Sequence, residues 1–285
     1  MSAAAKHYDF TIDRLGDAKL NSPIRMSKKG GDGLADYTKD TDRILYTITT
    51  EEVDGAVRPV SSDTLELAGP REKIYFNPSH VHAAICTCGG LCPGLNNVIR
   101  SVVRCFWYRD GVRRISGIQY GYLGLLENSP WPIIDLNPDV VDEIQEKGGT
   151  ILGSARGGGK QVEEIVDSLE RLNINILIAI GGDGTLRGAY DIGEEIKRRG
   201  LKIAVVGVPK TIDNDLSFID SSFGFDTAAS TAVPVVRGAH VEAKGAINGI
   251  GLVKVMGRES GFIAASTTLA QSDVNFCLIP ESPFD

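Results

Sequence analysis

The sequence predicts an α/β fold with doubly wound, mainly parallel sheets. Three observations lead to this expectation. Short apolar runs alternate with longer amphipathic segments from residue 81 onward. The run 174–180 is continuously apolar, as a parallel strand buried on both faces should be. Glycine-rich segments follow several of the runs, and parallel sheets bind their ligands at those strand ends.

The apolar runs set the predicted strands. Each is bounded by glycine, proline or charged residues, which interrupt a strand. A short strand is predicted at 45–49, in an otherwise polar N-terminal region with weak apolar periodicity. The predicted strands of the sheets are, in chain order, 81–88, 115–119, 174–180, 202–208, 247–256 and 274–279.

The segments between these strands carry apolar residues at helical spacing. In the clearest case, 161–172, they recur three or four positions apart: Val162, Ile165, Val166, Leu169 and Leu172. A helix is predicted over 225–244 even though Pro234 lies inside it. The other predicted helices are 95–108, 138–147, the segment from 185 to 199, and 259–271.

The composition excludes several classes of protein. The chain has 285 residues, of which 42% are hydrophobic and 24% charged, so it is globular rather than disordered. The net charge is 30 − 37 = −7, which disfavours general binding to nucleic acids or anionic membranes but leaves room for a local phosphate site. Five cysteines in a chain of this length indicate reduced thiols. No apolar run approaches the ~20 residues of a membrane span, and we expect a cytoplasmic protein.

The first glycine-rich segment, 88–94, lies between a predicted strand and a predicted helix. Gly89 and Gly90 let the backbone approach a phosphate, and the helix start supplies free N–H groups. A tight strand–helix turn is the alternative explanation of a glycine pair. The spacing of Cys86, Cys88 and Cys92 is C-x-C-x3-C and does not match a zinc site.

The second segment, 181–185, reads Gly-Gly-Asp-Gly-Thr and follows the run 174–180. A carboxylate between glycines at a strand end can reach Mg²⁺, and the glycines leave space for phosphates. The alternative is a turn with an Asp that caps the next helix.

The third segment, 209–215, reads Pro-Lys-Thr-Ile-Asp-Asn-Asp. We expect an extended loop with Asp213 and Asp215 on opposite sides and Thr211 on the side of Asp213. A hydroxyl beside a carboxylate that takes a proton suits phosphoryl transfer. An Asp-rich turn without a catalytic role is the alternative. Arg156, on a flexible loop, and Arg258, at the end of the predicted strand 247–256, suit phosphate binding, although surface ion pairs are the alternative for each of them.

Six segments, in this order, resemble those of the 6-phosphofructokinase family. They are Gly-Gly-x-x-Pro-Gly-x-Asn at 89–96, Leu-Gly-Ser-Ala-Arg at 152–156, Gly-Gly-Asp-Gly-Thr at 181–185, Pro-Lys-Thr-Ile-Asp-Asn-Asp at 209–215, Gly-Phe-Asp-Thr-Ala at 224–228, and Met-Gly-Arg at 256–258. The resemblance covers roughly 73–285. The Cys-Gly-Gly-Leu-Cys-Pro-Gly form of the first segment and the N-terminal extension resemble the plant and protist ATP-using branch.

The resemblance implies a role for each segment. It implies that ATP is held by Gly89, Gly90, Arg156, Gly157, Gly181, Gly182, Asp183, Gly184 and Thr185, with Asp183 as the ligand of Mg²⁺. Asp213 is implied as the base on the sugar 1-hydroxyl, Thr211 as a contact of the transferred group, and Arg156 as the stabiliser of transition-state charge. Fructose 6-phosphate is implied to contact Thr211, Asp213, Asp215, Met256, Gly257, Arg258 and Glu281.

Two positions bear on the phosphoryl donor. Gly184 has no side chain and leaves space for the α-phosphate of ATP, whereas pyrophosphate-using relatives carry Asp there. Lys210, by contrast, favours pyrophosphate as the donor, because pyrophosphate enzymes have Lys at this position and bacterial ATP enzymes have Gly. The combination resembles the plant and protist ATP enzymes, so ATP is the expected donor and pyrophosphate the alternative.

The implied organisation is an extension, 1–80, followed by two Rossmann-like halves. Residues 81–216 form the nucleotide-binding and catalytic half, and 217–285 begin the sugar-phosphate half, which we expect to be incomplete. The family's later Arg and His-x-x-Arg residues would lie beyond Asp285, and Gly249 stands where bacterial members have an Arg. The expected function is an allosteric, ATP-dependent 6-phosphofructokinase of glycolysis, in a homo-oligomer (a tetramer in the family) or a hetero-oligomer with full-length subunits. The alternatives are an inactive nucleotide-binding subunit and a NAD or lipid kinase with the same Gly-Gly-Asp-Gly loop.

Overall fold

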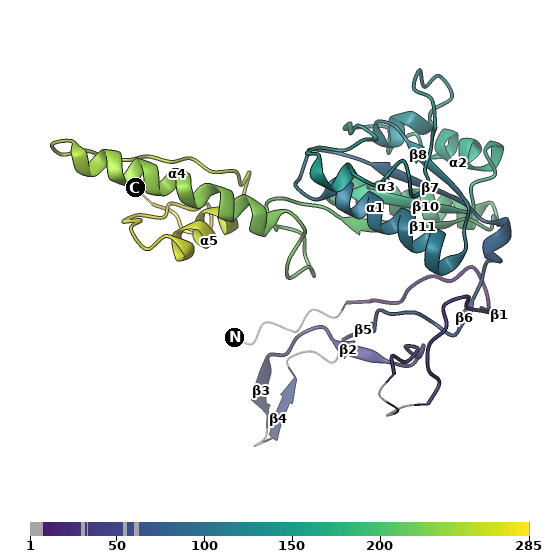
Figure 1. The fold of residues 1–285 in the computed structure, drawn as a ribbon. Coiled ribbons are helices and arrows are strands. Elements are labelled where there is room, and N and C mark those ends of the chain that lie inside the picture. The colour runs from purple at the N-terminus through teal and green to yellow at the C-terminus, as the bar shows by residue number, and fades with distance from the viewer. Residues whose placement is uncertain (1–7, 30–31, 33, 54–55, 60–62, 285) are drawn as a thin grey trace. The chain divides into compact units, whose positions relative to one another are not determined.

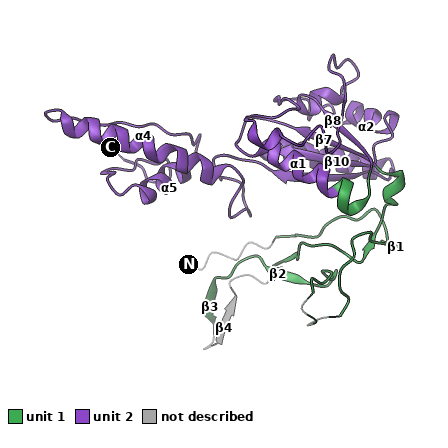
Figure 2. Cartoon of the chain, in the orientation of Figure 1, with its two compact units in different colours: residues 1–81, 106–112 green, residues 82–105, 113–285 purple. Residues whose placement is uncertain are grey.

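The computed structural model describes residues 8–29, 32, 34–53, 56–59 and 63–284. The chain divides into two compact units, which Figure 2 distinguishes by colour. Unit 1 comprises residues 1–81 and 106–112, and unit 2 comprises residues 82–105 and 113–285.

Unit 1 contains short antiparallel strand pairs. The pairs are β1 (Leu20–Asn21) with β6 (Lys73–Ile74), β2 (Arg43–Leu45) with β5 (Thr64–Glu66), and β3 (Thr50–Val53) with β4 (Ala56–Pro59). A short 3₁₀ helix, η1 (Pro78–His80), follows. The strand expected over 45–49 overlaps β2 only at Leu45, so that prediction was wrong in its bounds. The N–H of Thr49 donates to the Thr47 hydroxyl (3.1 Å), and such a local turn competes with strand pairing.

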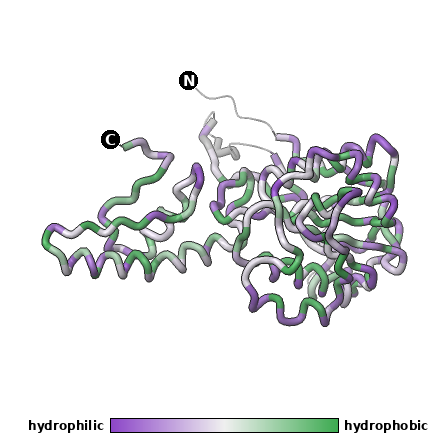
Figure 3. Tube along the Cα trace, turned by 90° about the horizontal axis from the view of Figure 1, so that it is seen from above, coloured by the Kyte–Doolittle hydropathy of each residue, from purple (hydrophilic) through white to green (hydrophobic). Residues whose placement is uncertain are grey.

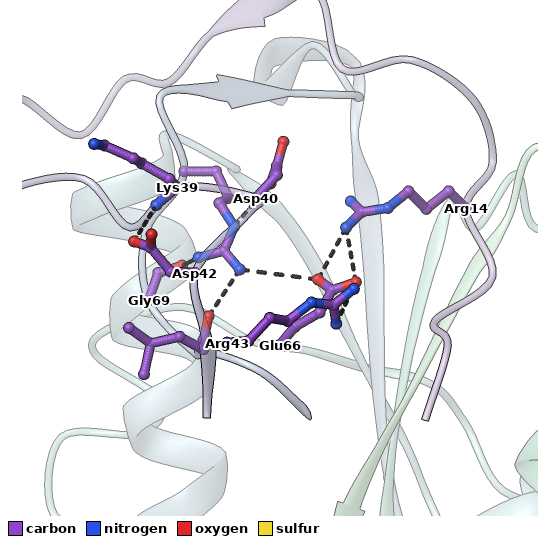
Figure 4. A network of polar contacts seen from close by, with 9 residues as sticks. Arg14, Lys39, Asp40, Asp42, Arg43, Glu66 and Gly69 are labelled. Atoms are coloured by element: carbon purple, nitrogen blue, oxygen red, sulfur yellow. Dashed lines mark hydrogen bonds and ion pairs between the residues drawn. The ribbon is translucent and has the colours of Figure 1, made fainter. Parts of the chain in front are cut away.

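A cluster of ion pairs around Glu66 joins segments of unit 1 that are distant in the sequence (Figure 4). Arg14 donates from Nη2 to both carboxylate oxygens of Glu66, at 3.0 and 2.9 Å. Arg43 and Arg71 each bring a guanidinium nitrogen to 3.9 Å from the same carboxylate. Arg71 also donates to Asp40 at 3.0 Å. Because the Glu66 side chain is only 12% exposed, its charge-assisted bonds hold the N-terminal segment against β5.

Unit 2 is built on a mixed five-stranded sheet in which four strands are parallel (Figure 1). The spatial order is β11 (Ala204–Pro209), β10 (Ile176–Gly181), β7 (His82–Thr87), β8 (Arg114–Ile118) and β9 (Ile134–Asp135). β9 pairs antiparallel with β8 at the edge. The α/β class and the mainly parallel sheet that the sequence predicted are therefore confirmed, and β9 was not expected.

The central strands β7 and β10 are buried because strands pair along both of their edges and helices pack against the sheet. All six residues of β7 are buried, and β10 is buried from Leu177 to Gly181. In register, Ile176 lies opposite Ala83 and Ile180 opposite Thr87. These strands consequently end together, and the segments that follow them begin at one edge of the sheet.

Five α-helices accompany the strands in the described part of the chain. They are α1 (Leu95–Arg104), α2 (Val162–Arg171), α3 (Asp183–Arg198), α4 (Phe225–Gly245) and α5 (Phe262–Ala270). A core of buried residues joins α2 and α3 to the sheet; it includes Ala84, Cys86, Ile165, Leu169, Leu177, Ala179, Ile192 and Ile196. Removing this apolar surface from water is the main stabilising term of unit 2. α4 accommodates Pro234 within its length.

Two helix predictions need correction. Over 138–147 the structure has only the 3₁₀ helix η4 (Ile144–Glu146). The side chain of Asn137 accepts the N–H groups of Asp139 and Val140, each at 3.0 Å, and this local turn replaces the first helical turn. The helix expected over 95–108 ends as α1 at Arg104 and continues as a π-helical segment, Cys105–Asp110.

Two further predictions were wrong: 247–256 and 274–279 do not form strands in the structure. Their side chains lie largely in solvent, with Ile250 90%, Leu252 87% and Phe276 84% exposed. A strand needs a paired neighbour for its backbone groups, and an apolar run in the sequence does not show whether that neighbour is present. α4 and α5 pack on each other. The segments that follow each of these helices also contain apolar residues (Figure 3).

Neither α4 nor any other helix in the described residues is both long and apolar enough to cross a lipid bilayer.

His82 supplies a pH-dependent contribution to the stability of unit 2. It is 5% exposed, donates from Nδ1 to the carbonyl of Leu172 (3.0 Å), and accepts at Nε2 from the Ser116 hydroxyl (2.8 Å). Burial, and then the nearby charge of Arg114, lower the pKa of His82 from its ordinary 6.5. The unfolded chain therefore takes up the proton first. The contribution is complete above about pH 6.5 and is lost as the pH falls through the folded-state pKa.

We predict that the free energy of unfolding, measured by urea denaturation, decreases between about pH 7.5 and pH 5.5, and that His82→Gln flattens this dependence. His80→Gln is the matched control, because His80 is exposed. An equal pH dependence in wild type and His82→Gln would contradict the assignment.

Candidate functional site

The loop after β7 depends on the conformational freedom of glycine. Gly89 has φ +85 and Gly94, which precedes α1, has φ +96, a region that residues with a side chain rarely adopt. The N–H of Gly89 donates to Ala155 (2.9 Å). The space next to Gly90 is open, since a Cβ there would meet nothing within 4 Å. The loop thus exposes backbone beside an open space at the end of a buried strand.

The segment that leads to Arg156 lies alongside the end of β7. Cys88 and Ala155 form a parallel bridge, and the Thr87 hydroxyl donates to the carbonyl of Gly153 (2.6 Å). Arg156 itself is exposed. The main chain therefore places Arg156 directly after a residue that is bonded to the Gly89–Gly90 loop.

Asn96, in the first turn of α1, fixes the start of that segment. Its side-chain nitrogen donates to the carbonyl of Lys147 (3.0 Å), and its oxygen accepts the N–H of Ile151 (2.9 Å). Asn96 is 2% exposed, so its buried side chain makes both bonds from inside the fold. One side chain therefore joins the helix after the glycine loop to the chain that carries Arg156.

The segment 181–185 connects β10 to α3. A Cβ on Gly181 would lie 2.2 Å from the Thr185 hydroxyl oxygen, so only glycine fits there. Gly184 has open space beside it. Asp183 is the first residue of α3, is exposed, and pairs with Arg187 at 2.7 Å. Its carboxylate at a helix N-terminus is available to a cation that also contacts an anion bound there.

Tyr122 supports the first turn of α3. It is 2% exposed, and its hydroxyl donates to the carbonyl of Thr185 (2.8 Å). Its ring lies against Gly159 and Gly188, where a Cβ would be 3.3 and 3.0 Å from ring carbons. The same side chain consequently contacts the loop after Arg156 and the first turns of α3.

The loop 209–215 begins at the end of β11. The N–H of Lys210 donates to Gly181 (2.9 Å), and its Nζ donates to the carbonyl of Gly90 (2.6 Å). Burial lowers the pKa of Lys210, which is 6% exposed. This single residue therefore connects the loops that follow β7, β10 and β11.

Thr211 points toward Asp215, which corrects the expectation that it points with Asp213. Its hydroxyl donates to Asp215 Oδ1 (2.6 Å) and accepts the N–H of Asp213 (3.2 Å). Asn214 has φ +54, so the chain turns instead of remaining extended. Within the described residues, the buried Oδ1 of Asp213 has no hydrogen-bond partner.

The residues expected at the sugar phosphate lie in a separate part of unit 2, beside α5. Met256 and Arg258 are exposed, and Gly257 has φ +126. Glu281 accepts the N–H of Gly261 with both carboxylate oxygens, at 2.9 and 3.0 Å.

A polar contact joins this part to the 209–215 loop. The Ser260 hydroxyl donates to the carbonyl of Asp213 (3.2 Å). The loops at the sheet edge are thus connected to one another by several hydrogen bonds, and Ser260 links them to the segment that carries Met256, Gly257 and Arg258.

The cysteines of the first loop contribute to packing. A hydrogen bond to Cys88, and then burial, raise the pKa of Cys86. The Cys92 thiol donates to the carbonyl of Phe223 (3.1 Å). No group of three or more His, Cys, Asp or Glu side chains arranged to hold a metal occurs in the described residues.

Sequence reasoning missed the contributions of Ser154, Asn96 and Tyr122. Ser154 donates to the carbonyl of Gly89 (2.7 Å). Ser154 and Asn96 lie inside two of the six segments, but no spacing rule distinguishes a side chain that supports a loop from one that faces the ligand. Tyr122 lies in η3 (Gly121–Leu125), which no periodicity predicted.

Comparison with known proteins identifies the relatives of this chain. A family model described as Phosphofructokinase matches residues 82–285. The chain belongs to the phosphofructokinase family. The resemblance inferred from the six segments is therefore confirmed.

Phosphofructokinases from distant organisms match this chain. It is 57% identical over 280 residues to the ATP-dependent 6-phosphofructokinase of Borreliella burgdorferi, covering 98% of this chain and 62% of that protein. It is 47% identical over 277 residues to the Trypanosoma brucei brucei enzyme of the same name (96% and 56%), and 58% identical over 217 residues to ATP-dependent 6-phosphofructokinase 7 of Arabidopsis thaliana (76% and 44%). The chain thus spans less than two thirds of the length of these curated relatives.

Solved phosphofructokinase structures share the fold. A pyrophosphate-dependent phosphofructokinase from Marinobacter aquaeolei aligns with a TM-score of 0.60 at 25% identity, covering 72% of this chain and 54% of that chain. Phosphofructokinase from Saccharomyces cerevisiae aligns with a TM-score of 0.57 at 27% identity, covering 67% and 28%.

Asn96→Ala should lower the free energy of unfolding by roughly 1–3 kcal/mol, because it removes both hydrogen bonds of a buried side chain, to the Lys147 carbonyl and from the Ile151 N–H. Thermal and urea unfolding measure the change. Asn97→Ala is the matched control, since Asn97 is the exposed neighbour on the same helix. Equal stability losses in the two variants would show that the Asn96 bonds do not stabilise the fold.

Proposed function

We propose that this chain is the catalytic part of an ATP-dependent 6-phosphofructokinase, which transfers the γ-phosphoryl group of ATP to the 1-hydroxyl of fructose 6-phosphate. The observation that carries the proposal is the convergence of three loops at one sheet edge, linked through Lys210. The relatives named ATP-dependent 6-phosphofructokinase support the choice of reaction and donor.

The donor phosphates are proposed to lie between the Gly89–Gly90 loop and the start of α3. Backbone N–H groups of the loop and the positive end of the α3 dipole favour an anion there. Arg156 and Gly157 complete the site from the neighbouring segment, and a guanidinium can follow charge that develops on the transferred group. Open space beside Gly184 accommodates a third phosphate.

The residues present fit a magnesium ion held partly by substrate. Mg²⁺ in kinase sites takes one or two carboxylates and fills its other positions with phosphate oxygens and water. Asp183 offers one exposed carboxylate next to the open space at Gly184. When bound, the ion would neutralise phosphate charge and make the γ-phosphorus easier to attack.

Asp213 is proposed as the general base. Its buried Oδ1 has no partner in the described residues and is therefore ready to accept the proton of the sugar 1-hydroxyl. The transferred group then passes from donor to sugar in line, which requires positioning more than covalent chemistry. Asp215 holds the Thr211 hydroxyl, so Thr211 is oriented before it meets the transferred group.

The sugar-phosphate side is proposed to include Met256, Gly257, Arg258 and Glu281. We infer two doubly wound, Rossmann-like halves after an extension at 1–80, with 81–216 carrying the nucleotide and 217–285 beginning the sugar half. A homo-oligomer or an association with longer subunits, a cytoplasmic location and effector control belong to the same proposal.

Asp213→Asn should lower kcat by about 10³-fold, because the amide cannot accept a proton, and should leave the Kd of Mg²⁺·ATP within about twofold. A coupled assay of fructose 1,6-bisphosphate and calorimetric titration measure the two quantities. Asp220→Asn removes an exposed carboxylate nearby and should keep full turnover. Turnover of Asp213→Asn at the wild-type rate would refute the assignment of the base.

Gly184→Asp should lower kcat/KM for ATP by at least about 100-fold, since a carboxylate would fill the open space and repel the donor phosphates. Gly193→Asp, also on α3 with open space beside it, is the matched control and should retain activity. Turnover with pyrophosphate is measured in parallel. Turnover of the wild-type protein with pyrophosphate and not with ATP would contradict the proposal that ATP is the donor.

A further inference from the structure

Two consecutive carbonyl groups of the glycine loop are held by side chains from different parts of the fold. Ser154 donates its hydroxyl proton to the carbonyl of Gly89 at 2.7 Å. Lys210 donates from Nζ to the carbonyl of Gly90 at 2.6 Å. Ser154 belongs to the segment before Arg156, and Lys210 follows β11. The loop is therefore held from two sides through its main chain.

The planarity of the peptide bond converts these contacts into a direction for two N–H groups. In a trans peptide the carbonyl of one residue and the N–H of the next point opposite ways. The bond from Ser154 to Gly89 turns the N–H of Gly90 away from Ser154, and the bond from Lys210 to Gly90 turns the N–H of Leu91 away from Lys210. Among the hydrogen bonds of the described residues, neither N–H has an acceptor.

The surroundings of these two N–H groups suit an anion. Gly90 and Leu91 are exposed, and the space next to Gly90 is open. Successive main-chain N–H groups without an acceptor can form a concave anion site. The ammonium of Lys210 and the guanidinium of Arg156 interact electrostatically with each other, so both add positive charge to this region.

We propose that Ser154 and Lys210 are positioning residues that aim the N–H groups of Gly90 and Leu91 at the donor phosphates. The inference rests on the proposed function and assigns Ser154 a part in it. It also specifies how Lys210 affects the donor. Lys210 is 6% exposed and its Nζ is bonded to the Gly90 carbonyl, so the inference gives it a role through the main chain of the loop.

A simply structural role would give a different pattern. Hydrogen bonds that only stabilise the fold affect the unfolding temperature and leave the affinity of the folded protein for phosphates unchanged. Positioning bonds affect affinity for the donor, because loose peptide groups must be ordered at the moment of binding. Their effect on fructose 6-phosphate should be smaller, because the residues proposed for the sugar phosphate, Met256, Gly257, Arg258 and Glu281, belong to the segments beside α5.

The test uses the full chain with Ser154→Ala, Lys210→Met and the conservative Lys210→Arg. Ser101→Ala and Lys244→Met are matched controls, because both residues are exposed on helices away from the loop. Calorimetry gives the Kd of Mg²⁺·ATP, and displacement gives that of inorganic tripolyphosphate, which has phosphates and no nucleoside. Steady-state kinetics give KM for each substrate, and thermal melting reports folding.

Ser154→Ala and Lys210→Met should each weaken Mg²⁺·ATP and tripolyphosphate by about tenfold, the size of one lost oriented hydrogen bond. KM for fructose 6-phosphate should change less than about twofold, and Lys210→Arg should restore most of the affinity because it keeps a donor. The control variants should match wild type. Ser154→Ala tests the inference alone if Lys210→Met fails to fold.

A lowered melting temperature with unchanged affinity for both probes would overturn the inference. So would a wild-type chain that binds neither probe. A wild-type chain that binds tripolyphosphate but does not phosphorylate fructose 6-phosphate would contradict the proposed function. In that case the phosphate affinities of the variants can still be compared with that of the wild type. The positioning role of Ser154 and Lys210 and the proposed function are therefore tested separately.

Discussion

The parallel pairing of β10 with β7 and β11 is the constraint on which the rest of the structure depends. Main-chain hydrogen bonds set the three strands in register, and burial of the apolar strand residues holds them there. Because parallel strands point the same way, the loops that follow them begin at one edge. Gly181 lets the Thr185 side chain approach the main chain closely, and Gly90 and Gly184 leave open space beside the loops. The sheet thus places the candidate phosphate site, and the glycines open it.

A second layer of contacts makes this edge a connected unit. Lys210 bonds to the main chain of Gly90 and Gly181, and Asn96 and Tyr122 bond main-chain groups near the other segments. These side chains are buried and bond to backbone groups. They therefore hold the loops in position and are not proposed to take part in the reaction. Preorganised N–H groups can meet phosphate charge without reorganising, which is how an enzyme of this kind is expected to stabilise a transferred phosphoryl group.

Sequence reasoning reached the strand–helix alternation and the family because continuous apolar runs and ordered motifs are local signals. It failed where tertiary contacts decide. The run 247–256 reads as a strand, yet pairing depends on a neighbour that no local pattern specifies. Thr211 was expected beside Asp213, but the left-handed conformation of Asn214 turns it to Asp215. Contacts such as that of Ser154 with the glycine loop join residues far apart in the chain, which spacing alone cannot reveal.

The most direct test of the account is the amide spectrum of the protein, labelled at glycine and leucine, during titration with a non-hydrolysable Mg²⁺·ATP analogue. The account predicts that the Gly90 and Leu91 amide signals shift with a common Kd, because their N–H groups meet the phosphates. The Gly200 amide, in the turn after α3, should not move. Saturable binding that leaves Gly90 and Leu91 unshifted would contradict the proposal that this loop holds the donor.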